Sequence, residues 1–236
     1  MKKGDKKKQH KALKRRTQSK TARSLQRAVS MIHPALRHLN QARSYPIENC
    51  WVQEDWQESG LAVVCVARRQ PDGNIVFGVY MVDCYCLGVK DAYFNVDILP
   101  SVFQREFLPK IFSSAGTPID LSPDLAHEIV YGAVEYAKQF GFRPHADFKR
   151  AQLVLDPPEA HPRTGAVTFG KDGKPFYVSG PHDNVDAIMR QLARATGEGN
   201  FHFMTRLEEL PEDLFEEEPD ELDEEADDFG DDFDLY

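Results

Sequence analysis

Apolar runs in the first half of the chain predict β-structure. The Val- and Ala-rich segment Leu61–Arg69 and the apolar segment Ile75–Cys84 flank Pro71–Asn74, whose sequence is Pro-Asp-Gly-Asn. Two β-rich runs separated by such residues are typical of an antiparallel hairpin. Ile47–Gln53 is expected to add a neighbouring strand, joined to the hairpin by the acid-rich segment Glu54–Gly60. The pattern therefore predicts a three-stranded meander.

After this region the apolar residues recur at helical spacing. The spacing predicts a helix over Ile98–Phe112, in which Pro109 disturbs the last turn. A second helix is expected to open with Ser122 as its N-cap and Pro123 at its first position, and to end at Gly141. Its apolar stripe consists of Leu125, Ile129, Val130, Ala133, Val134 and Ala137.

The last third of the middle region contains segments with helical spacing and segments with strand-like alternation. We expect a short helix near Asp147–Leu155, a second hairpin over Ala166–Val178, a last helix over Asp183–Ala195 and an edge strand over Asn200–Met204. Strands and helices are grouped rather than strictly alternating. The sequence therefore predicts an α+β fold, with a mainly antiparallel sheet built from hairpins and packed with several helices.

The two ends of the chain carry opposite charge. Residues 1–30 contain twelve Lys or Arg and one acid, whereas residues 207–236 contain seventeen Asp or Glu and no Lys or Arg. Blocks of like charge cannot bury themselves and act through long-range fields. We expect a disordered basic arm over 1–20, a single α+β domain with an N-terminal helix over 21–206, and a disordered acidic tail over 207–236.

Composition also indicates the cellular compartment. No run of eighteen apolar residues is present, and no apolar core follows the N-terminal lysines, so neither a membrane span nor a secretory signal is expected. The four cysteines form no Cys-x-x-Cys pair and have no histidine at zinc spacing. We therefore expect a cytoplasmic protein with reduced thiols, no bound metal and no membrane partner.

The basic arm favours binding to RNA or DNA. Its cationic side chains can neutralise phosphates and release counterions, which gives salt-sensitive and sequence-independent binding. The arm contains no aromatic residue for base stacking, and a solubilising tail is the alternative interpretation. The residues expected to bind phosphate are Lys6, Lys7, Lys8, Lys11, Lys14, Arg15, Arg16 and Lys20.

The acidic tail has a second possible role besides solvation. Phe215, Phe229, Phe233 and Tyr236 interrupt its acids, as in segments that dock on a basic surface. The partner is expected to be a basic protein surface or the basic arm itself, and in the second case the tail competes with nucleic acid.

One segment invites a catalytic interpretation. Asp83, Lys90 and Asp91 lie within nine residues of one another, and carboxylates with a lysine suit Mg²⁺-dependent phosphoester hydrolysis. In the alternative, the acids cap turns and the lysine is solvated, which is the commoner situation at strand ends. His127 and Glu128 are further candidates for the same cleft.

The histidines give weaker signals for a site. His127 lacks the second histidine that a zinc peptidase helix requires, because Tyr131 stands four residues later. His127, Tyr131 and Glu135 share one helix face, which we expect to be solvated, and the lining of a cleft is the alternative. Loop residues offer a second way to build a polar pocket, and the turn Ser179–His182 offers backbone amides to an anion. These loop residues are His145, Asp147, His161 and His182.

Three segments carry a resemblance. Val82–Asp91, Ile129–Ala137 and Phe169–Pro175 resemble blocks shared by uncharacterised bacterial hypothetical proteins. The resemblance covers most of the middle domain and neither charged end. It implies no activity and assigns no site residue.

Two classes of function therefore stay open. The first is a binding or adaptor protein that contacts nucleic acid or a ribonucleoprotein through its arm, without a cofactor and with the acidic tail as modulator. The second is a metal-dependent nuclease or phosphoester hydrolase that uses the Asp83–Asp91 segment and Mg²⁺. Convergence of the five candidate side chains favours the enzyme, and their dispersal favours the binding protein.

Overall fold

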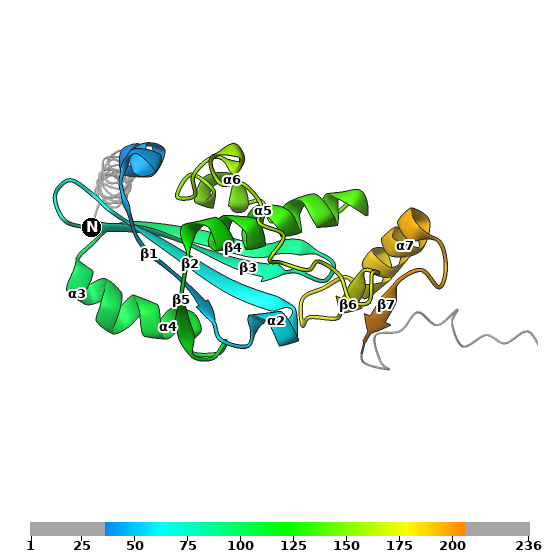
Figure 1. The fold of residues 1–236 in the computed structure, drawn as a ribbon. Coiled ribbons are helices and arrows are strands. Elements are labelled where there is room, and N and C mark those ends of the chain that lie inside the picture. Colours follow the sequence, from blue (N-terminus) through cyan, green and yellow to red (C-terminus); the bar gives the residue numbers. More distant parts are fainter. Residues whose placement is uncertain (1–35, 206–236) are drawn as a thin grey trace, which may run out of the picture.

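The computed structural model describes residues 36–205 (Figure 1). The predicted basic arm, the acidic tail and most of the predicted N-terminal helix lie outside the described residues. Residues 36–41 are helical and continue into a 3₁₀ turn, η1 (Ala42–Ser44). Among the helices of this range, none is long and apolar enough to cross a membrane.

A five-stranded antiparallel sheet with the order β4-β3-β2-β1-β5 forms the centre of the domain. The predicted meander is confirmed, and β2 pairs with β3 over the full length of both strands. The predicted connection between β1 and β2 contains one helical turn, α2 (Trp56–Ser59). The strands are β1 (Ile47–Gln53), β2 (Leu61–Arg69), β3 (Ile75–Asp83), β4 (Gly88–Ile98) and β5 (Pro118–Leu121).

The sheet is wider than the sequence pattern predicts, because β4 and β5 form its two edges. β4 carries polar residues that interrupt its alternation. Two of them, Asp91 and Asn95, accept hydrogen bonds from the backbone N–H groups of Ala92 (2.7 Å) and Val96 (3.0 Å). Such side-chain acceptors satisfy edge amides that would otherwise attract another strand. Lys90 and Asp91 of the Asp83–Asp91 segment lie in β4, which begins at Gly88, and Asp83 is the last residue of β3.

One face of the sheet is covered by α5 (Pro123–Gln139) and α6 (Phe148–Ala151), as Figure 1 shows. The predicted start of α5 is confirmed, since Ser122 accepts a hydrogen bond from the Leu125 N–H (3.2 Å) and Pro123 is the first helical residue. This cap satisfies an amide that has no partner within the helix. The long helix therefore begins at a fixed residue and carries its apolar stripe onto the sheet.

The opposite face is covered by a helical run made of α3 (Pro100–Val102), a π turn (Phe103–Phe107) and α4 (Leu108–Phe112). In the π turn, the Leu108 N–H bonds to the Phe103 carbonyl, five residues back. The wider turn comes directly before Pro109, which has no N–H to donate. The predicted helix is therefore confirmed, and the disturbance precedes the proline. Phe77 of β3 packs against the Phe103 and Phe107 rings, with centroids 5.0 and 5.3 Å away.

The C-terminal part is a small parallel unit in which β6 (Phe176–Val178), α7 (Val185–Thr196) and β7 (His202–Met204) follow one another. The last helix and the last strand were predicted, but the hairpin over 166–178 is wrong. Lys171 and Lys174 do close a turn, yet β6 pairs with β7 across α7. Residues 166–170 form no strand, because this segment runs along α5 and places the Phe169 ring against Tyr136.

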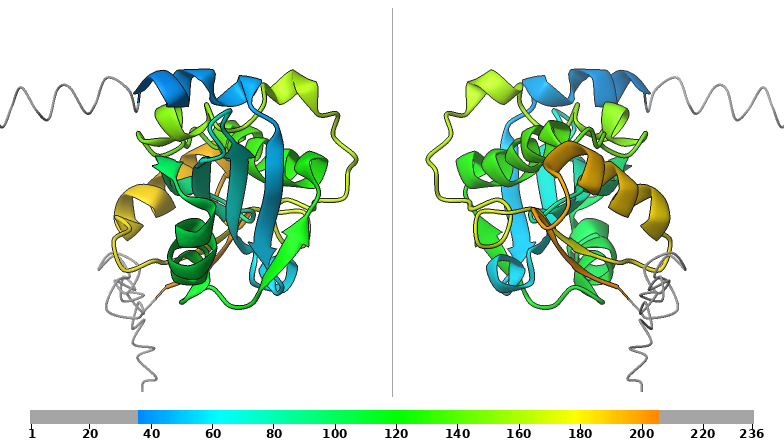
Figure 2. Two further views of the ribbon diagram at one scale, coloured as in Figure 1. Left: turned by 90° about the vertical axis from the view of Figure 1, so that its left-hand side faces the viewer. Right: turned by 90° about the vertical axis from the view of Figure 1, so that its right-hand side faces the viewer.

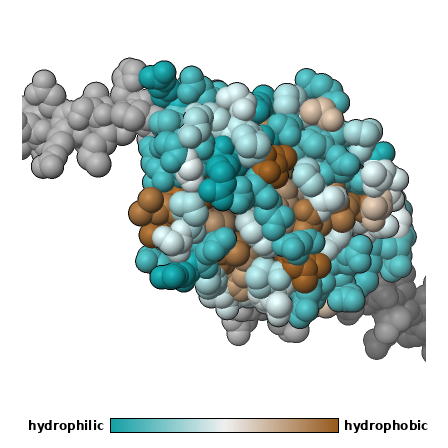
Figure 3. Space-filling view, turned by 60° about the vertical axis from the view of Figure 1, so that its left-hand side comes forward, coloured by the Kyte–Doolittle hydropathy of each residue, from teal (hydrophilic) through white to brown (hydrophobic). Residues whose placement is uncertain are grey.

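The α+β class with a mainly antiparallel sheet is confirmed. All four cysteines are buried and unpaired, as expected. The face shown in Figure 3 is mostly hydrophilic, and its apolar side chains form separate small patches. This face therefore offers polar rather than apolar contacts.

Gly132 tests the packing of the 166–170 segment on α5. A methyl group at this position would overlap the Phe169 ring. Gly132→Ala is expected to lower the free energy of unfolding by about 1–2 kcal/mol, although alanine normally stabilises a helix interior by about 0.5–1 kcal/mol relative to glycine. Urea denaturation measures the change. In a Phe169→Ala background the same substitution should stabilise the protein, and loss of stability in both backgrounds would contradict the packing.

Candidate functional site

The candidate Asp83 is a buried turn-forming residue. Its carboxylate accepts hydrogen bonds from the backbone N–H groups of Tyr85 (2.9 Å), Cys86 (2.9 Å) and Leu87 (3.2 Å). Burial raises the pKa of this carboxyl, while the three amides and Lys90 act in the opposite direction. The side chain fixes the connection from β3 to β4, as in the turn-capping alternative.

Lys90 ties the C-terminal unit to the main sheet. Its Nζ lies 2.8 Å from Asp183 Oδ2, and both side chains are largely buried. The same oxygen of Asp183 accepts hydrogen bonds from the Gly180 N–H (2.8 Å) and the Tyr177 hydroxyl (3.3 Å). The turn that was expected to offer its amides to an anion therefore uses one of them for Asp183. Asp91 is exposed and lies 3.6 Å from the His145 ring.

His127 and Glu128 lie on α5, and both are buried. The prediction of a solvated face is wrong for His127 and Tyr131, whereas Glu135 is exposed. Glu128 accepts hydrogen bonds from the Thr164 N–H (3.0 Å), the Thr164 hydroxyl (2.6 Å) and the Val167 N–H (3.4 Å). Burial alone raises the pKa of Glu128, but these hydrogen bonds lower it below its ordinary value. Each of the five catalytic candidates thus has its own structural partners.

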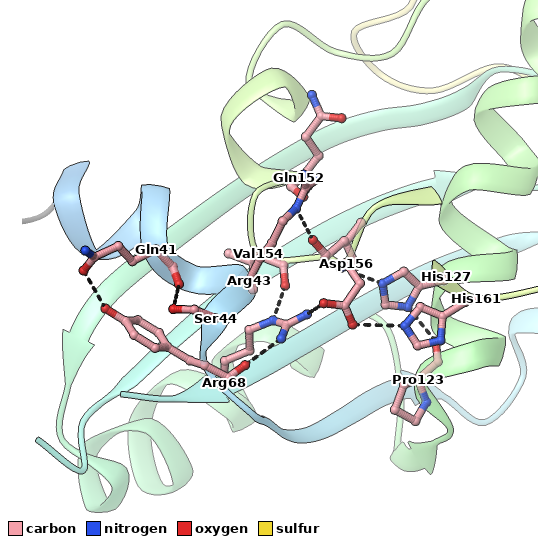
Figure 4. Close-up of polar contacts among 12 residues, drawn as sticks. Gln41, Arg43, Ser44, Arg68, Pro123, His127, Gln152, Val154, Asp156 and His161 are labelled. Atoms are coloured by element: carbon pink, nitrogen blue, oxygen red, sulfur yellow. Dashed lines mark hydrogen bonds and ion pairs between the residues drawn. The ribbon is translucent and has the colours of Figure 1, made fainter. Parts of the chain in front are cut away.

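A different set of side chains converges beside α5. Ligand atoms of His127, Asp156 and His161 all lie within 4.8 Å of one another, and no other such group of three occurs within residues 36–205. Arg68 contacts Asp156 of this group, as Figure 4 shows. Asp124 contacts His161. We call these five residues the histidine cluster.

Asp156 is the centre of the histidine cluster. Its Oδ1 accepts from Arg68 Nη2 (2.5 Å), and its Oδ2 lies 3.0 Å from His161 Nε2. Its backbone N–H donates to His127 Nε2 (2.8 Å), and its carbonyl accepts from the Tyr131 hydroxyl (3.1 Å). Neighbouring positive charge and hydrogen bonds lower the pKa of Asp156 although burial acts to raise it. One residue therefore joins β2, α5 and the loop after residue 155.

The hydrogen bonds assign His127 as a neutral ring. Its Nδ1 lies 2.7 Å from the Pro123 carbonyl, which can only accept, so this nitrogen carries the proton. Its Nε2 accepts the Asp156 N–H and must be unprotonated. Burial lowers the pKa of His127 to about 4. Both nitrogens are therefore engaged.

His161 has the opposite environment. Its Nδ1 lies 2.5 Å from Asp124 Oδ1, and its Nε2 lies 3.0 Å from Asp156 Oδ2. Two carboxylates are both satisfied only by a doubly protonated ring. Burial acts to lower the pKa of His161, but the two carboxylates raise it above its ordinary value. The ring stacks on His127, with centroids 3.9 Å apart and planes at 24°.

Arg68 supplies the second positive charge and is buried, with 3% of its side chain exposed. Its Nε donates to the Val154 carbonyl (2.5 Å) and its Nη1 to the Tyr45 carbonyl (2.7 Å). With His161 protonated, two cations face the carboxylates of Asp124 and Asp156. The histidine cluster is then neutral overall, which offsets the burial of Arg68 and the partial burial of Asp156 and His161.

The ligand atoms of His127, Asp156 and His161 are close enough to share a metal ion, but such an ion would have to rearrange the group. Metal ligands direct their lone pairs at one point, and a ring lone pair lies in the plane of its ring. The two histidine rings are stacked with planes 24° apart, so both lone pairs reach one ion only after a ring reorients. The His127 Nε2 lone pair already accepts an amide proton. The arrangement as it stands instead suits an attachment of the loop after residue 155 to α5, in which His161 can gain or lose a proton.

Sequence reasoning considered His161 among scattered loop residues but missed its partners. His145 lies apart from His161 and pairs with Asp91 and Asp147 instead. A signal for the cluster was available in Arg68, because an arginine at the end of a buried apolar strand requires an acidic partner. The sequence does not say which of the many acids that partner is.

A cleft of about 280 Å³ lies between α2, the β3–β4 turn and the segment after residue 165. Aromatic residues Trp56 and Tyr85 line one side, and Thr168 and Lys171 line the other. None of the five catalytic candidates lines this cleft.

No family model, no curated protein and no solved structure matches the chain. The interpretation of the site therefore rests on its own geometry, and the resemblance to bacterial hypothetical proteins stays a prediction.

Two adjacent arginines provide a matched test of the cluster. Arg68→Met removes the buried cation from the Asp156 carboxylate and leaves the Val154 and Tyr45 carbonyls without their donor, and it is expected to cost about 3–5 kcal/mol of unfolding free energy. The control Arg69→Met removes an exposed pair with Glu48 and should cost far less. Urea denaturation compares the two. Combining Arg68→Met with Asp156→Asn should cost less than the sum of the single changes. Equal losses for Arg68→Met and Arg69→Met would contradict the account.

Proposed function

We propose that this chain is a cytoplasmic binding or adaptor protein that contacts nucleic acid or a ribonucleoprotein through its basic arm. The observation that carries the proposal is the segregation of charge, about +11 over residues 1–30 and −17 over residues 207–236. A dense cationic segment binds phosphates chiefly by releasing counterions, which requires no particular sequence in the nucleic acid.

The dispersal of the catalytic candidates supports binding over hydrolysis. Asp83 uses its carboxylate oxygens on three amides of its own turn. Lys90 is paired with Asp183, and Asp91 is exposed on the edge strand. A metal-dependent nuclease needs carboxylates that converge on one ion. No specific observation favours that alternative.

The end of the domain nearest the arm supports the same proposal. Arg37, Lys149 and Arg150 are exposed there, and none of the three forms an ion pair with an acid of residues 36–205. Arg43 joins residues 36–44 to α6 by donating to the carbonyls of Leu155 (2.9 Å) and Gln152 (3.3 Å). These surface cations therefore lie close to where the arm leaves the domain, and they extend its positive charge.

The described part of the chain ends after β7, at the other end of the domain. The 36–44 helix and β7 lie at opposite ends of the domain in both views of Figure 2. Residues 206–236, fully extended, reach roughly 100 Å. This length suffices to reach the arm of the same chain and compete with phosphate, and a basic surface on another protein is the second candidate partner. Either contact makes the tail a modulator of the arm.

Fluorescence anisotropy of labelled RNA and DNA, measured against salt concentration, tests the proposal. The full chain should bind with an affinity that falls steeply with salt. Replacing the eight arm cations Lys6, Lys7, Lys8, Lys11, Lys14, Arg15, Arg16 and Lys20 with Gln should abolish binding. Removing residues 207–236 should tighten it.

Two triple variants distinguish the effect of these surface cations on binding from the effect of net charge. The first variant replaces Arg37, Lys149 and Arg150 with Gln, and it should weaken binding and reduce the dependence of affinity on salt concentration. The second variant replaces Lys138, Arg190 and Arg194 with Gln. It removes the same charge from α5 and α7 and should have a smaller effect. Binding that survives neutralisation of the arm, or no binding by any variant, would reject the proposal.

A further inference from the structure

Residues 156–170, here called the strap, run along α5 and are fastened to it at several points. His161 contacts Asp124 in the first turn of the helix, and Thr164 contacts Glu128 in the next. Further along, Arg163 Nη2 lies 2.5 Å from Glu135 Oε2. The strap therefore follows the helix from its N-terminus towards its C-terminal half.

The far end of the strap forms one wall of the cleft of about 280 Å³. Ala166, Thr168 and Gly170 line it together with Trp56 and Tyr85. The Gly170 N–H donates to the Cys84 carbonyl (3.0 Å), so this end is fixed to the β3–β4 turn. The position of the strap therefore sets the shape of the cleft.

Among the side chains that attach the strap to α5, histidine is the residue type whose ordinary pKa lies near neutral pH. The hydrogen bonds to Glu128 lower the pKa of that carboxyl, which moves it further from neutral pH. The groups that face His161 are Asp124 and His127 from α5, Asp156 from the strap, and Arg68 of β2 across Asp156. With 15% of its side chain exposed, His161 can exchange its proton with solvent.

We propose that His161 is a proton-controlled latch, which fastens the strap to α5 when its ring is doubly protonated and releases the first half of the strap when it loses a proton. The doubly protonated ring donates one hydrogen bond to Asp124 and one to Asp156. A singly protonated ring can donate to only one of them. The other carboxylate then faces a nitrogen lone pair, and the cluster carries an uncompensated negative charge.

The two stacked histidines give the latch a recognisable pH dependence. The pKa of His161 is raised in the folded protein, so its contribution to stability is full below about pH 6.5 and is lost as the pH rises through the raised value. The pKa of His127 is lowered to about 4, so its contribution is full above about pH 6.5 and is lost as the pH falls towards 4. The cluster is therefore most stable near the ordinary pKa of histidine.

Hydrogen exchange of the full-length protein, followed by mass spectrometry between pH 5 and 9 and corrected for intrinsic rates, tests the latch. Peptides covering the strap should lose protection as the pH rises through the folded pKa of His161, which lies above the ordinary value. The Ile129–Gln139 part of α5 should keep its protection over the same range.

Three variants make the test decisive. His161→Gln should give low and pH-independent protection of the strap, because glutamine cannot serve both carboxylates as a cation. His145→Gln, the control at an exposed histidine between Asp91 and Asp147, should behave as the wild type. Asp124→Asn removes one exposed acceptor and should move the loss of protection to lower pH. Constant protection of the wild-type strap from pH 6 to 9, or a His161→Gln variant that follows the wild type, would overturn the proposal.

Discussion

The buried guanidinium of Arg68 is the constraint on which the arrangement beside α5 depends. A buried cation requires a carboxylate, and Asp156 provides it. Because the backbone and side chain of Asp156 also contact His127, Tyr131 and His161, the Arg68 pair fixes where the chain after residue 155 meets α5. A single charge in β2 thus determines the course of a segment nearly ninety residues later. The protonation states of both histidines follow from the same contacts.

Polar side chains have different roles in the interior of the domain and on its surface. The polar groups that resemble catalytic residues in the sequence have structural roles. Asp83 stabilises a turn, Lys90 pairs with Asp183 of the C-terminal unit, and Glu128 binds Thr164 of the strap. The charges that remain free to meet other molecules lie on the outside and at the ends of the chain. In the function proposed above, the domain is the spacer between a basic and an acidic segment of the chain, and the proposed latch adds a proton-sensitive element to it.

Much of the fold was predictable because its strongest elements are specified locally. The β2–β3 hairpin has its own turn sequence, and α5 has its own cap and apolar stripe. The edge strand β4 was missed because two of its polar residues satisfy edge amides instead of alternating with apolar ones. The other edge strand, β5, has only four residues and carries little pattern. The parallel pairing of β6 with β7 depends on contacts across α7. The histidine cluster joins Arg68, Asp124 and Asp156, whose proximity no local pattern encodes.

Long-range ¹H–¹⁵N NMR spectra of the histidine rings in the full-length protein at pH 6 test the central claim most directly. The account predicts a neutral His127 protonated at Nδ1 beside a doubly protonated His161, with neither ring changed by added Zn²⁺. Variants of each histidine assign the signals. A neutral His161 at this pH, or nitrogen shifts of both rings on adding Zn²⁺, would contradict a self-neutralised fastening and indicate a metal site instead.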